Sequence, residues 1–303
     1  MSCDAAWPAL FPGFAEHVVK LDDVAIRVRV GGKGPALLLL HGYPQTSAMW
    51  HRVAPQLAKH HTVVAADLRG YGRSSCPPTD MDHRPYAKRT MAADMLGVMR
   101  ELGHDRFCVM GHDRGGRVAY RLALDHPSRI ERLVLLDIIT THDQWSAANQ
   151  SIRLKMFHWA FLAQPAPMPE SLIGRDPMDW LDGRFKRGTK TRTLDPIDPL
   201  ALAEYRLCFS DPDHIHATCE DYRAGARCDL VDDDADLAGG RMIRCPTLLV
   251  WASEGPMADI ADPLALWRQW CEHVEGVEID SGHFIAEEAP DALLARVVPF
   301  LGR

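Results

Sequence analysis

The stretch FCVMGHDRGGRVAY, residues 107–120, joins an apolar run to a helical pattern through a glycine-rich turn. An unbroken apolar run is typical of a strand that is buried on both faces of a parallel sheet. Gly111 and Gly115 leave room for a tight reversal with Asp113 at its tip, and the following helix directs its first N–H groups there. The stretch predicts a strand–turn–helix unit that presents a carboxylate. An aspartate that merely caps the helix is the alternative.

Similar apolar runs and helical patterns flank this unit on both sides. Buried strands are predicted at 36–42, 62–70, 132–138, 247–253 and 274–283, and helices at 46–60, 87–103 and 115–126. The segment HVVKLDDVAIRVRVGG (17–32) alternates like a hairpin with Asp22 and Asp23 at its turn. The sequence therefore predicts an α/β fold, with a mostly parallel, eight-stranded sheet covered by helices on both faces.

Residues 142–240 differ in character from the rest of the chain. They are rich in Trp, Met, Pro and Asp, and their apolar residues recur at helical spacing. We predict a helical cap inserted between two parts of a core, 1–141 and 241–303. The cap is expected over the carboxyl ends of the strands, where ligands bind in open α/β folds.

Two charged segments of the predicted cap have less specific interpretations. The acidic run DLVDDDAD (229–236) lacks the glycine and the spaced glutamate of a calcium loop, so we interpret it as a solvated connection. The basic run LDGRFKRGTKTRT (181–193) is interpreted as a surface segment that could attract acidic substrates toward the cap.

Composition limits the class of protein and its partners. The chain has 303 residues and a formal net charge of −7, which argues against nucleic acid or an anionic membrane as a partner. No apolar run approaches the ~18–20 residues of a membrane span, and no signal peptide is recognisable. The eight cysteines form no C-x-x-C pair. We therefore predict a soluble cytoplasmic protein with reduced thiols.

Three acidic or basic residues at strand ends form a predicted catalytic triad. The chain order is nucleophile, acid, histidine: Asp113, Asp137 at the end of LLLD, and His283 in SGHF. Glu254 and Asp259, which follow the strand TLLVWAS, are the less favoured alternatives for the acid. Each of these residues alone is usually structural, and only their conjunction indicates a site.

Four motifs together carry a resemblance to a known family. HGYPQT (41–46), DLRGYGRS (67–74), GHDRGG (111–116) and SGHF (281–284) resemble the α/β-hydrolase superfamily. Within it, the D-R-x-x-R run resembles the fluoroacetate (haloacetate) dehalogenases, because haloalkane dehalogenases and epoxide hydrolases usually have Trp after the nucleophile. The resemblance implies a small haloacid as substrate, fluoroacetate or chloroacetate giving glycolate, without cofactor or metal. Relatives of this kind are often homodimers.

A carboxylate nucleophile fits displacement at a saturated carbon. Asp113 is ionised at neutral pH without help, and the ester that it forms can be hydrolysed by water that His283 activates. Asp137 would hold the imidazole tautomer. The backbone N–H groups of Tyr43 and Arg114 are the expected oxyanion donors.

The predicted substrate pocket combines two arginines with donors from the cap. Arg114 and Arg117 are neighbours on one helix face, where two guanidinium forks could hold a carboxylate; the alternative is that they bridge to acids. In the resembled family a His-Trp pair and a Tyr from the cap bind the leaving halide ion. His158, Trp159 and Tyr222 match these positions, although core packing of a cap helix would otherwise explain the first two.

Other residues near these motifs, and two other functions, are compatible with the sequence. His112 and Trp50 either line the pocket or pack, Tyr71 is interpreted as structural, and the HIH run (214–216) predicts no metal site. An epoxide hydrolase would need two cap tyrosines, for which Tyr205 and Tyr222 are the candidates. A ligand-binding protein without catalysis is the third possibility, and it would not need the triad.

Overall fold

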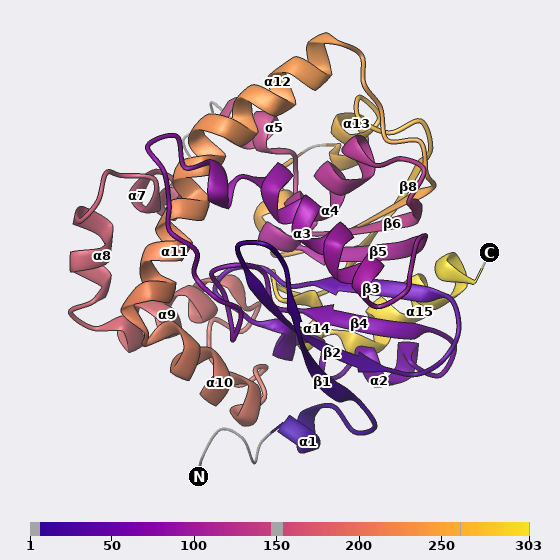
Figure 1. The fold of residues 1–303 in the computed structure, drawn as a ribbon, viewed down its shortest axis with the longest axis horizontal. Coiled ribbons are helices and arrows are strands. Elements are labelled where there is room, and N and C mark those ends of the chain that lie inside the picture. The colour runs from indigo at the N-terminus through magenta and orange to yellow at the C-terminus, as the bar shows by residue number, and fades with distance from the viewer. Residues whose placement is uncertain (1–6, 147–153, 261, 303) are drawn as a thin grey trace.

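The computed structural model describes residues 7–146, 154–260 and 262–302 (Figure 1). The strands are β1 Ala15–Lys20, β2 Ala25–Gly31, β3 Ala36–Leu40, β4 Thr62–Ala66, β5 Phe107–His112, β6 Ile130–Leu136, β7 Thr247–Ala252 and β8 Val274–Ile279. The core helices are α1 Trp7–Leu10, α2 Ala54–Leu57, α3 Lys88–Glu101, α4 Asp113–Asp125, α13 Pro263–Trp267, α14 Ile285–Glu288 and α15 Pro290–Leu301. Between β6 and β7 lie α5 Thr141–Ser146, α7 Phe157–Leu162, α8 Met168–Ile173, α9 Pro177–Gly188, α10 Pro199–Phe209, α11 Pro212–Ala224 and α12 Leu230–Ala238. Short 3₁₀ turns occur at Ser47–Trp50, Arg84–Tyr86 and Pro256–Asp259, and a π turn at Gly225–Asp229.

The sheet has eight strands in the order β1-β2-β4-β3-β5-β6-β7-β8. β1 pairs with β2 and β2 with β4 in antiparallel fashion, and every other neighbouring pair is parallel. The predicted hairpin is confirmed, since Leu21 N–H donates to Val24 O at 2.9 Å across its turn. The mostly parallel eight-stranded sheet predicted from the apolar runs is therefore confirmed.

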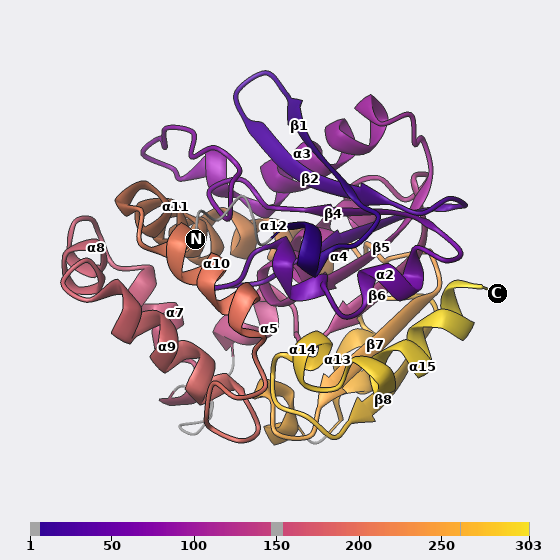
Figure 2. The same ribbon diagram turned by 90° about the horizontal axis from the view of Figure 1, so that it is seen from below.

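Helices cover both faces of the sheet, which explains why the central strands are continuous apolar runs. Every residue of β3 and of β5 is buried. α3 and α4 pack together with α4 against β5 and β6, whereas α2 contacts β4 and α15 contacts β7 (Figure 2). The order of strands and helices thus brings the carboxyl ends of the parallel strands to one edge.

Of the helices between β6 and β7, α7 to α11 lie on the left of Figure 1, and α5 and α12 lie at its top. The described residues of this segment contain helices and no strand. α11 continues through the π turn into α12, so that one long rod runs from the outer end of this group back to the core (Figure 1). We keep the name cap for these helices, the first of which begins at Thr141. The division into a core and a cap at 142–240 stays a proposal.

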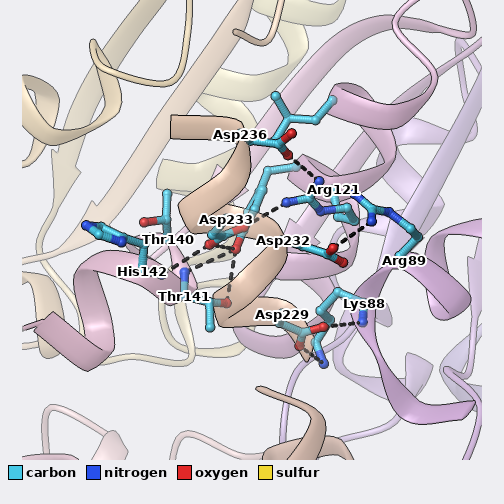
Figure 3. Close-up of polar contacts among 12 residues, drawn as sticks. Lys88, Arg89, Arg121, Thr140, Thr141, His142, Asp229, Asp232, Asp233 and Asp236 are labelled. Carbon is cyan, nitrogen blue, oxygen red and sulfur yellow. Dashed lines mark hydrogen bonds and ion pairs between the residues drawn. The ribbon is translucent and has the colours of Figure 1, made fainter. Parts of the chain in front are cut away.

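The acidic run 229–236 is not a solvated connection, and that prediction was wrong. Asp229, Asp233 and Asp236 are buried, because their spacing places them on one face of the rod, toward the core. Arg121 of α4 donates to Asp233 at 2.8 Å and also binds Asp236, and the N–H of Lys88 donates to Asp229 at 2.7 Å (Figure 3). These ion pairs fasten α12 to the core.

Other structural findings concern the membrane, thiols and metals. Within the described ranges, no helix is both long and apolar enough to cross a lipid bilayer. No disulfide joins any of the described cysteines, which exclude Cys3. No cluster of His, Cys, Asp or Glu in this part of the chain is arranged to hold a metal ion.

Candidate active site

The turn between β5 and α4 places Asp113 at the carboxyl edge of the sheet. Asp113 is the first residue of α4 and has a φ of 47°, a left-handed conformation that costs free energy for a residue with a side chain. Gly115 makes the reversal possible, because a Cβ atom there would lie 2.3 Å from the carbonyl oxygen of His41. The strained aspartate is thus held by close packing, as expected for a side chain that must be presented at a fixed angle.

The three predicted triad residues come together at the carboxyl edge of the sheet, Asp113 after β5, Asp137 after β6 and His283 after β8. His283 Nδ1 lies 2.7 Å from Asp137 Oδ2, and its Nε2 lies 3.9 Å from Asp113 Oδ2. Because an ionised carboxylate only accepts hydrogen bonds, Nδ1 carries a hydrogen, and Nε2 is the ring nitrogen that faces Asp113. Asp137 also accepts from Ala252 N–H at 3.2 Å, which fixes the carboxylate in turn.

The alternative acids do not approach the histidine. Glu254 has half of its side chain exposed and lies 3.8 Å from Arg192, and Asp259 pairs with Lys155 at 2.6 Å. Asp137 is the acid that contacts the histidine, and Gly255 lies against it. A Cβ atom at Gly255 would come within 2.3 Å of Asp137 Oδ2. The glycine at this position therefore leaves space for the carboxylate of Asp137.

Opposite charges set the protonation states of the pair that faces the cavity. Burial raises the pKa of Asp113, but the charge of His283, helped by Arg114 and Arg117, outweighs it and lowers the pKa below its usual value. For His283 burial lowers the pKa, and the hydrogen bond and charge of Asp137, together with the charge of Asp113, more than compensate and raise it. Asp113 is therefore ionised at neutral pH.

One of the two expected oxyanion donors already contacts the aspartate. The backbone N–H of Tyr43 donates to Asp113 Oδ1 at 2.8 Å. This hydrogen bond distinguishes the two carboxylate oxygens, since Oδ1 faces an amide and Oδ2 faces His283. The corresponding role of the Arg114 N–H stays a prediction.

The two arginines after Asp113 are both buried but differ in their partners. Arg114 donates from Nε and Nη2 to the two carboxylate oxygens of Asp221, at 2.8 and 2.6 Å, and its Nη1 has no partner. Arg117 forms no ion pair within the described residues: its Nη1 lies 3.3 Å from Thr141 Oγ1 and its Nε is unpaired. The alternative of a bridge to an acid therefore holds for Arg114 alone, and only for part of its guanidinium.

Asp221 is a residue of the site that the sequence did not reveal. Besides Arg114 it binds Lys88 Nζ and accepts from the Tyr71 hydroxyl at 2.7 Å. Burial would raise its pKa, but the charges of Arg114 and Lys88 lower it strongly. Tyr71, interpreted as structural, thus helps to position the acid that orients Arg114.

Aromatic rings from the cap lie over the arginines. The Tyr222 ring centroid is 4.2 Å from Arg114 Cζ and the Trp159 centroid is 4.3 Å from Arg117 Cζ, distances typical of cation–π contacts. The Tyr222 ring lies 5.8 Å from the His158 ring and 5.5 Å from the Tyr43 ring. The cap residues predicted for the halide thus lie beside the residues predicted for the carboxylate.

The same cap residues hold buried polar atoms without partners: His158 Nδ1, Trp159 Nε1 and Tyr222 Oη. Burial, followed by the charge of Arg184, lowers the pKa of His158 well below its usual value, so the ring is neutral. Its Nε2 lies 3.4 Å from Arg184 Nη2, which can only donate, and this places the ring hydrogen on Nδ1. Each of the three atoms is then a donor available to a ligand.

Two cavities meet at Asp113 and His283. The larger has a volume of about 710 Å³ and is also lined by Tyr43, His158 and Arg184. The smaller cavity has a volume of about 20 Å³, and Arg117 and Asp137 also line it. A volume of this size accommodates about one water molecule. The reactive pair therefore faces a large space on one side and a very small one on the other.

The basic segment 181–193 is not entirely a surface segment, and the prediction was wrong for its buried residues and for Arg184. Most of it forms α9, in which Leu181 and Phe185 are buried. Arg184 lies between them in the chain, and its guanidinium lines the large cavity with Nε and Nη1 shielded from solvent. Helical periodicity turns this one arginine inward while Lys186 and Arg187 stay exposed.

The remaining candidates lie outside the reactive pair. Tyr205 is buried and its hydroxyl donates to Glu287 at 3.0 Å, so it does not stand beside Tyr222. His112 packs under the site with Nε2 2.9 Å from the carbonyl oxygen of His283, and burial lowers its pKa to about 3. Trp50 is fully buried. The two histidines of the HIH run contact Gly70 and Glu170 separately.

The chain is similar to several characterised families over nearly its whole length. The family model described as the α/β hydrolase fold matches residues 35–290. A fluoroacetate dehalogenase from Burkholderia sp is 44% identical over 93% of this chain and 92% of its own. A soluble epoxide hydrolase from Corynebacterium sp. (strain C12) is 30% identical over 94% of this chain and 96% of its own. A solved structure from Nostoc sp PCC 7120, assigned to the α/β hydrolases, has 46% identity and a TM-score of 0.92 over 95% of this chain and 98% of its own.

The fold, the strained aspartate between β5 and α4 and these similarities agree with one another. The match of the family model covers the strands and helices that position the site, and the dehalogenase similarity covers core and cap alike. The chain therefore belongs to the α/β-hydrolase fold family and, within it, to the haloacetate dehalogenase family.

Proposed function

We propose that the protein hydrolyses the carbon–halogen bond of short 2-haloacids, with haloacetate giving glycolate. The nucleophile is Asp113, the base is His283, and Asp137 orients the imidazole. The similarity to a fluoroacetate dehalogenase supports this reaction class. A homodimeric state and a cytoplasmic location stay predictions.

One observation carries the proposal: all five residues predicted to bind the substrate keep donors that are buried and have no partner among the described residues. The donors are Arg114 Nη1, Arg117 Nε, His158 Nδ1, Trp159 Nε1 and Tyr222 Oη. Leaving such groups without partners costs about 1–3 kcal/mol each, so a site that keeps several of them is suited to a polar ligand. A carboxylate and a halide are acceptors only, which matches a set made of donors only.

In the first step Asp113 Oδ2 attacks the α-carbon of the haloacid. Arg114 and Arg117 hold the substrate carboxylate and offset its repulsion from Asp113. The carbon–oxygen bond forms as the carbon–halogen bond breaks, and the halide leaves with the bonding electron pair toward His158 and its neighbours.

In the second step water hydrolyses the ester. His283 Nε2 accepts a proton from the water, whose oxygen attacks the Asp113 carbonyl carbon. The oxyanion develops on Oδ1, where the Tyr43 N–H lies. The small cavity beside Asp113 and His283 is the proposed position of this water. The hydroxy acid leaves with the original aspartate oxygen, and one water oxygen remains on Asp113.

The other candidate functions are less favoured by the same geometry. An epoxide hydrolase would need two cap tyrosines facing one substrate, and Tyr205 is turned toward Glu287. A neutral epoxide also has no use for Arg117, which is buried without an acid. A binding protein without chemistry would not need the arrangement of Asp113, His283 and Asp137.

Isotope labelling tests the proposal directly. A single turnover with chloroacetate in ¹⁸O-water should place the label on Asp113, found by peptide mass spectrometry, and unlabelled oxygen in the glycolate. Label found first in the glycolate would mean that water attacks the substrate directly and would refute the ester. Chloride release assayed beside styrene oxide hydrolysis separates the dehalogenase from the epoxide hydrolase.

A further inference from the structure

The large cavity exceeds what the proposed substrate requires. It has a volume of about 710 Å³, within the ~300–1,000 Å³ range of pockets that enclose drug-sized ligands. Haloacetate has only a handful of non-hydrogen atoms. Asp113, His283 and His158 line this cavity, so that the extra volume adjoins the reactive pair and reaches one residue of the proposed halide site.

The walls of the cavity away from Asp113 are predominantly basic. Lys155, Arg184, Lys186, Arg187 and Arg192 line it, against Glu254 and the nucleophile as the only acids among its described lining residues. Lys155 is neutralised by Asp259, and Arg192 lies 3.8 Å from Glu254. Lys186 and Arg187 are exposed, so water hydrates their charges.

Arg184 is different because no acid among the described residues neutralises it and two of its guanidinium nitrogens are shielded from water. Its Nε and Nη1 are shielded from solvent and lack partners, and its Nη2 lies 3.4 Å from His158 Nε2. Within the described residues no carboxylate lies within ion-pair distance of it. Residues 147–153, which the structure does not describe, contain neither Asp nor Glu.

A guanidinium in this state is arranged to meet an anion. Removing an ion from water costs several kcal/mol unless an opposite charge compensates it. Burial lowers the pKa of Arg184, and neighbouring acidic groups, Asp113 among them, offset only part of that effect. A carboxylate in the cavity would accept a charge-assisted hydrogen bond from one of these shielded N–H groups.

We propose that the cavity accepts 2-haloacids with a second anionic group, the 2-halodicarboxylates, and that Arg184 binds the distal carboxylate. This rests on the proposed function, because Arg114 and Arg117 still hold the carboxylate next to the reacting carbon. The chemistry is unchanged: Asp113 displaces the halide, which leaves with its electron pair, and water hydrolyses the ester. 2-Chlorosuccinate and water then yield malate, chloride and a proton.

The test compares dianions with monoanions of equal length. The value of kcat/KM is measured for 2-chlorosuccinate against 2-chlorobutanoate, and for 2-chloroglutarate against 2-chloropentanoate, with the hydroxy acid quantified. At least one dianion should be about tenfold better than its partner, equivalent to about 1.4 kcal/mol for one added ion pair. Arg184→Leu should bring that ratio to about one, and Arg184→Lys should keep part of it.

A matched control lies one helical turn further along α9. Arg187→Leu removes an exposed charge from the same cavity and should change the ratio by less than about threefold. Succinate and butanoate, which have no halogen, give a readout independent of turnover. By calorimetry succinate should bind more tightly than butanoate to the unaltered protein, and this difference should disappear in Arg184→Leu.

The possible failures can be told apart. If chloroacetate is hydrolysed through an ester on Asp113 but no dianion is preferred, the second-anion site is refuted and the proposed function stands. The same conclusion follows if Arg184→Leu keeps the preference. If succinate binding depends on Arg184 while no haloacid is hydrolysed, the proposed function fails and the anion site stands.

Discussion

Replacing Arg117 by methionine should make the protein more stable and nearly inactive, whereas the same change at Arg121 should make it much less stable. Both arginines lie on α4, one turn apart, and each is only 2% exposed. Arg121 binds Asp233 at 2.8 Å and also Asp236, whereas Arg117 has no acid partner among the described residues. Burial lowers the pKa of Arg117, but the carboxylates raise that of Arg121 despite its burial.

The magnitude follows from these contacts. Burying an unpaired guanidinium costs about 3–5 kcal/mol. The contact with the Trp159 ring offsets about 1–2 kcal/mol of this cost, and the hydrogen bond to Thr141 offsets about 1 kcal/mol. Arg117→Met should therefore raise the free energy of unfolding by about 1–2 kcal/mol. Arg121→Met strands two buried carboxylates and should lower it by about 3–5 kcal/mol.

Urea unfolding followed by circular dichroism measures the change in the free energy of unfolding, and halide release from chloroacetate measures the change in activity. For a chain of this size, Tm should rise by about 2–4 °C in Arg117→Met and fall by about 6 °C or more in Arg121→Met. The value of kcat/KM should fall about 100-fold or more in Arg117→Met, because the clamp loses about 3 kcal/mol. If Arg117→Met were destabilised like Arg121→Met, or kept its activity, the interpretation that the uncompensated charge of Arg117 serves to bind the substrate would be refuted.

Four further outcomes are expected. In His283→Asn one equivalent of chloroacetate should release one equivalent of chloride and leave a stable carboxymethyl ester on Asp113; continued turnover without an adduct would contradict the scheme. Loss of the Asp113 charge in the ester should lower the pKa of His283, so hydrolysis of the isolated ester should fall off only below the pKa that NMR finds for His283 in the free protein; an equal or higher value would count against the charge coupling. Asp137→Asn should slow ester hydrolysis, measured by rapid quench, about 100-fold or more while halide release persists, and a slowed first step instead would assign it another role. Asp221→Asn should raise KM for chloroacetate and lower Tm, since it loosens Arg114 and leaves its charge uncompensated; unchanged values of both would remove Asp221 from the site.

The sequence predicted those parts of the fold and site that local pattern determines. Strands such as 36–40 and 107–112 are buried on both faces, which leaves continuous apolar runs. The turn at Asp113 requires glycines at fixed spacing, Asp137 directly follows β6, and His283 comes four residues after the end of β8. Each of these signals lies within a few residues of the feature that it predicts, so no partner elsewhere in the chain had to be known.

The sequence did not predict features that depend on partners far away in the chain. Asp221 meets Arg114 across 107 residues, and nothing in either local sequence indicates the other. Arg184 looks like its exposed neighbours because its whole segment is basic, and only the packing of α9 turns it inward. The acids of 229–236 were interpreted as solvated for the same reason, since Arg121 lies on a distant helix.

The continuous rod formed by α11, the π turn and α12 divides the cap into two parts. We expect the sequences of these parts to differ in how far they can change among relatives. Tyr222 and Asp221 lie on this rod, which polar contacts of Lys88 and Arg121 attach to α3 and α4. His158, Trp159 and Arg184 lie instead on α7 and α9, within the preceding run of short helices. Chimeras that graft residues 157–209 from a relative should therefore alter which acids are accepted while the anchored half of the pocket keeps its shape.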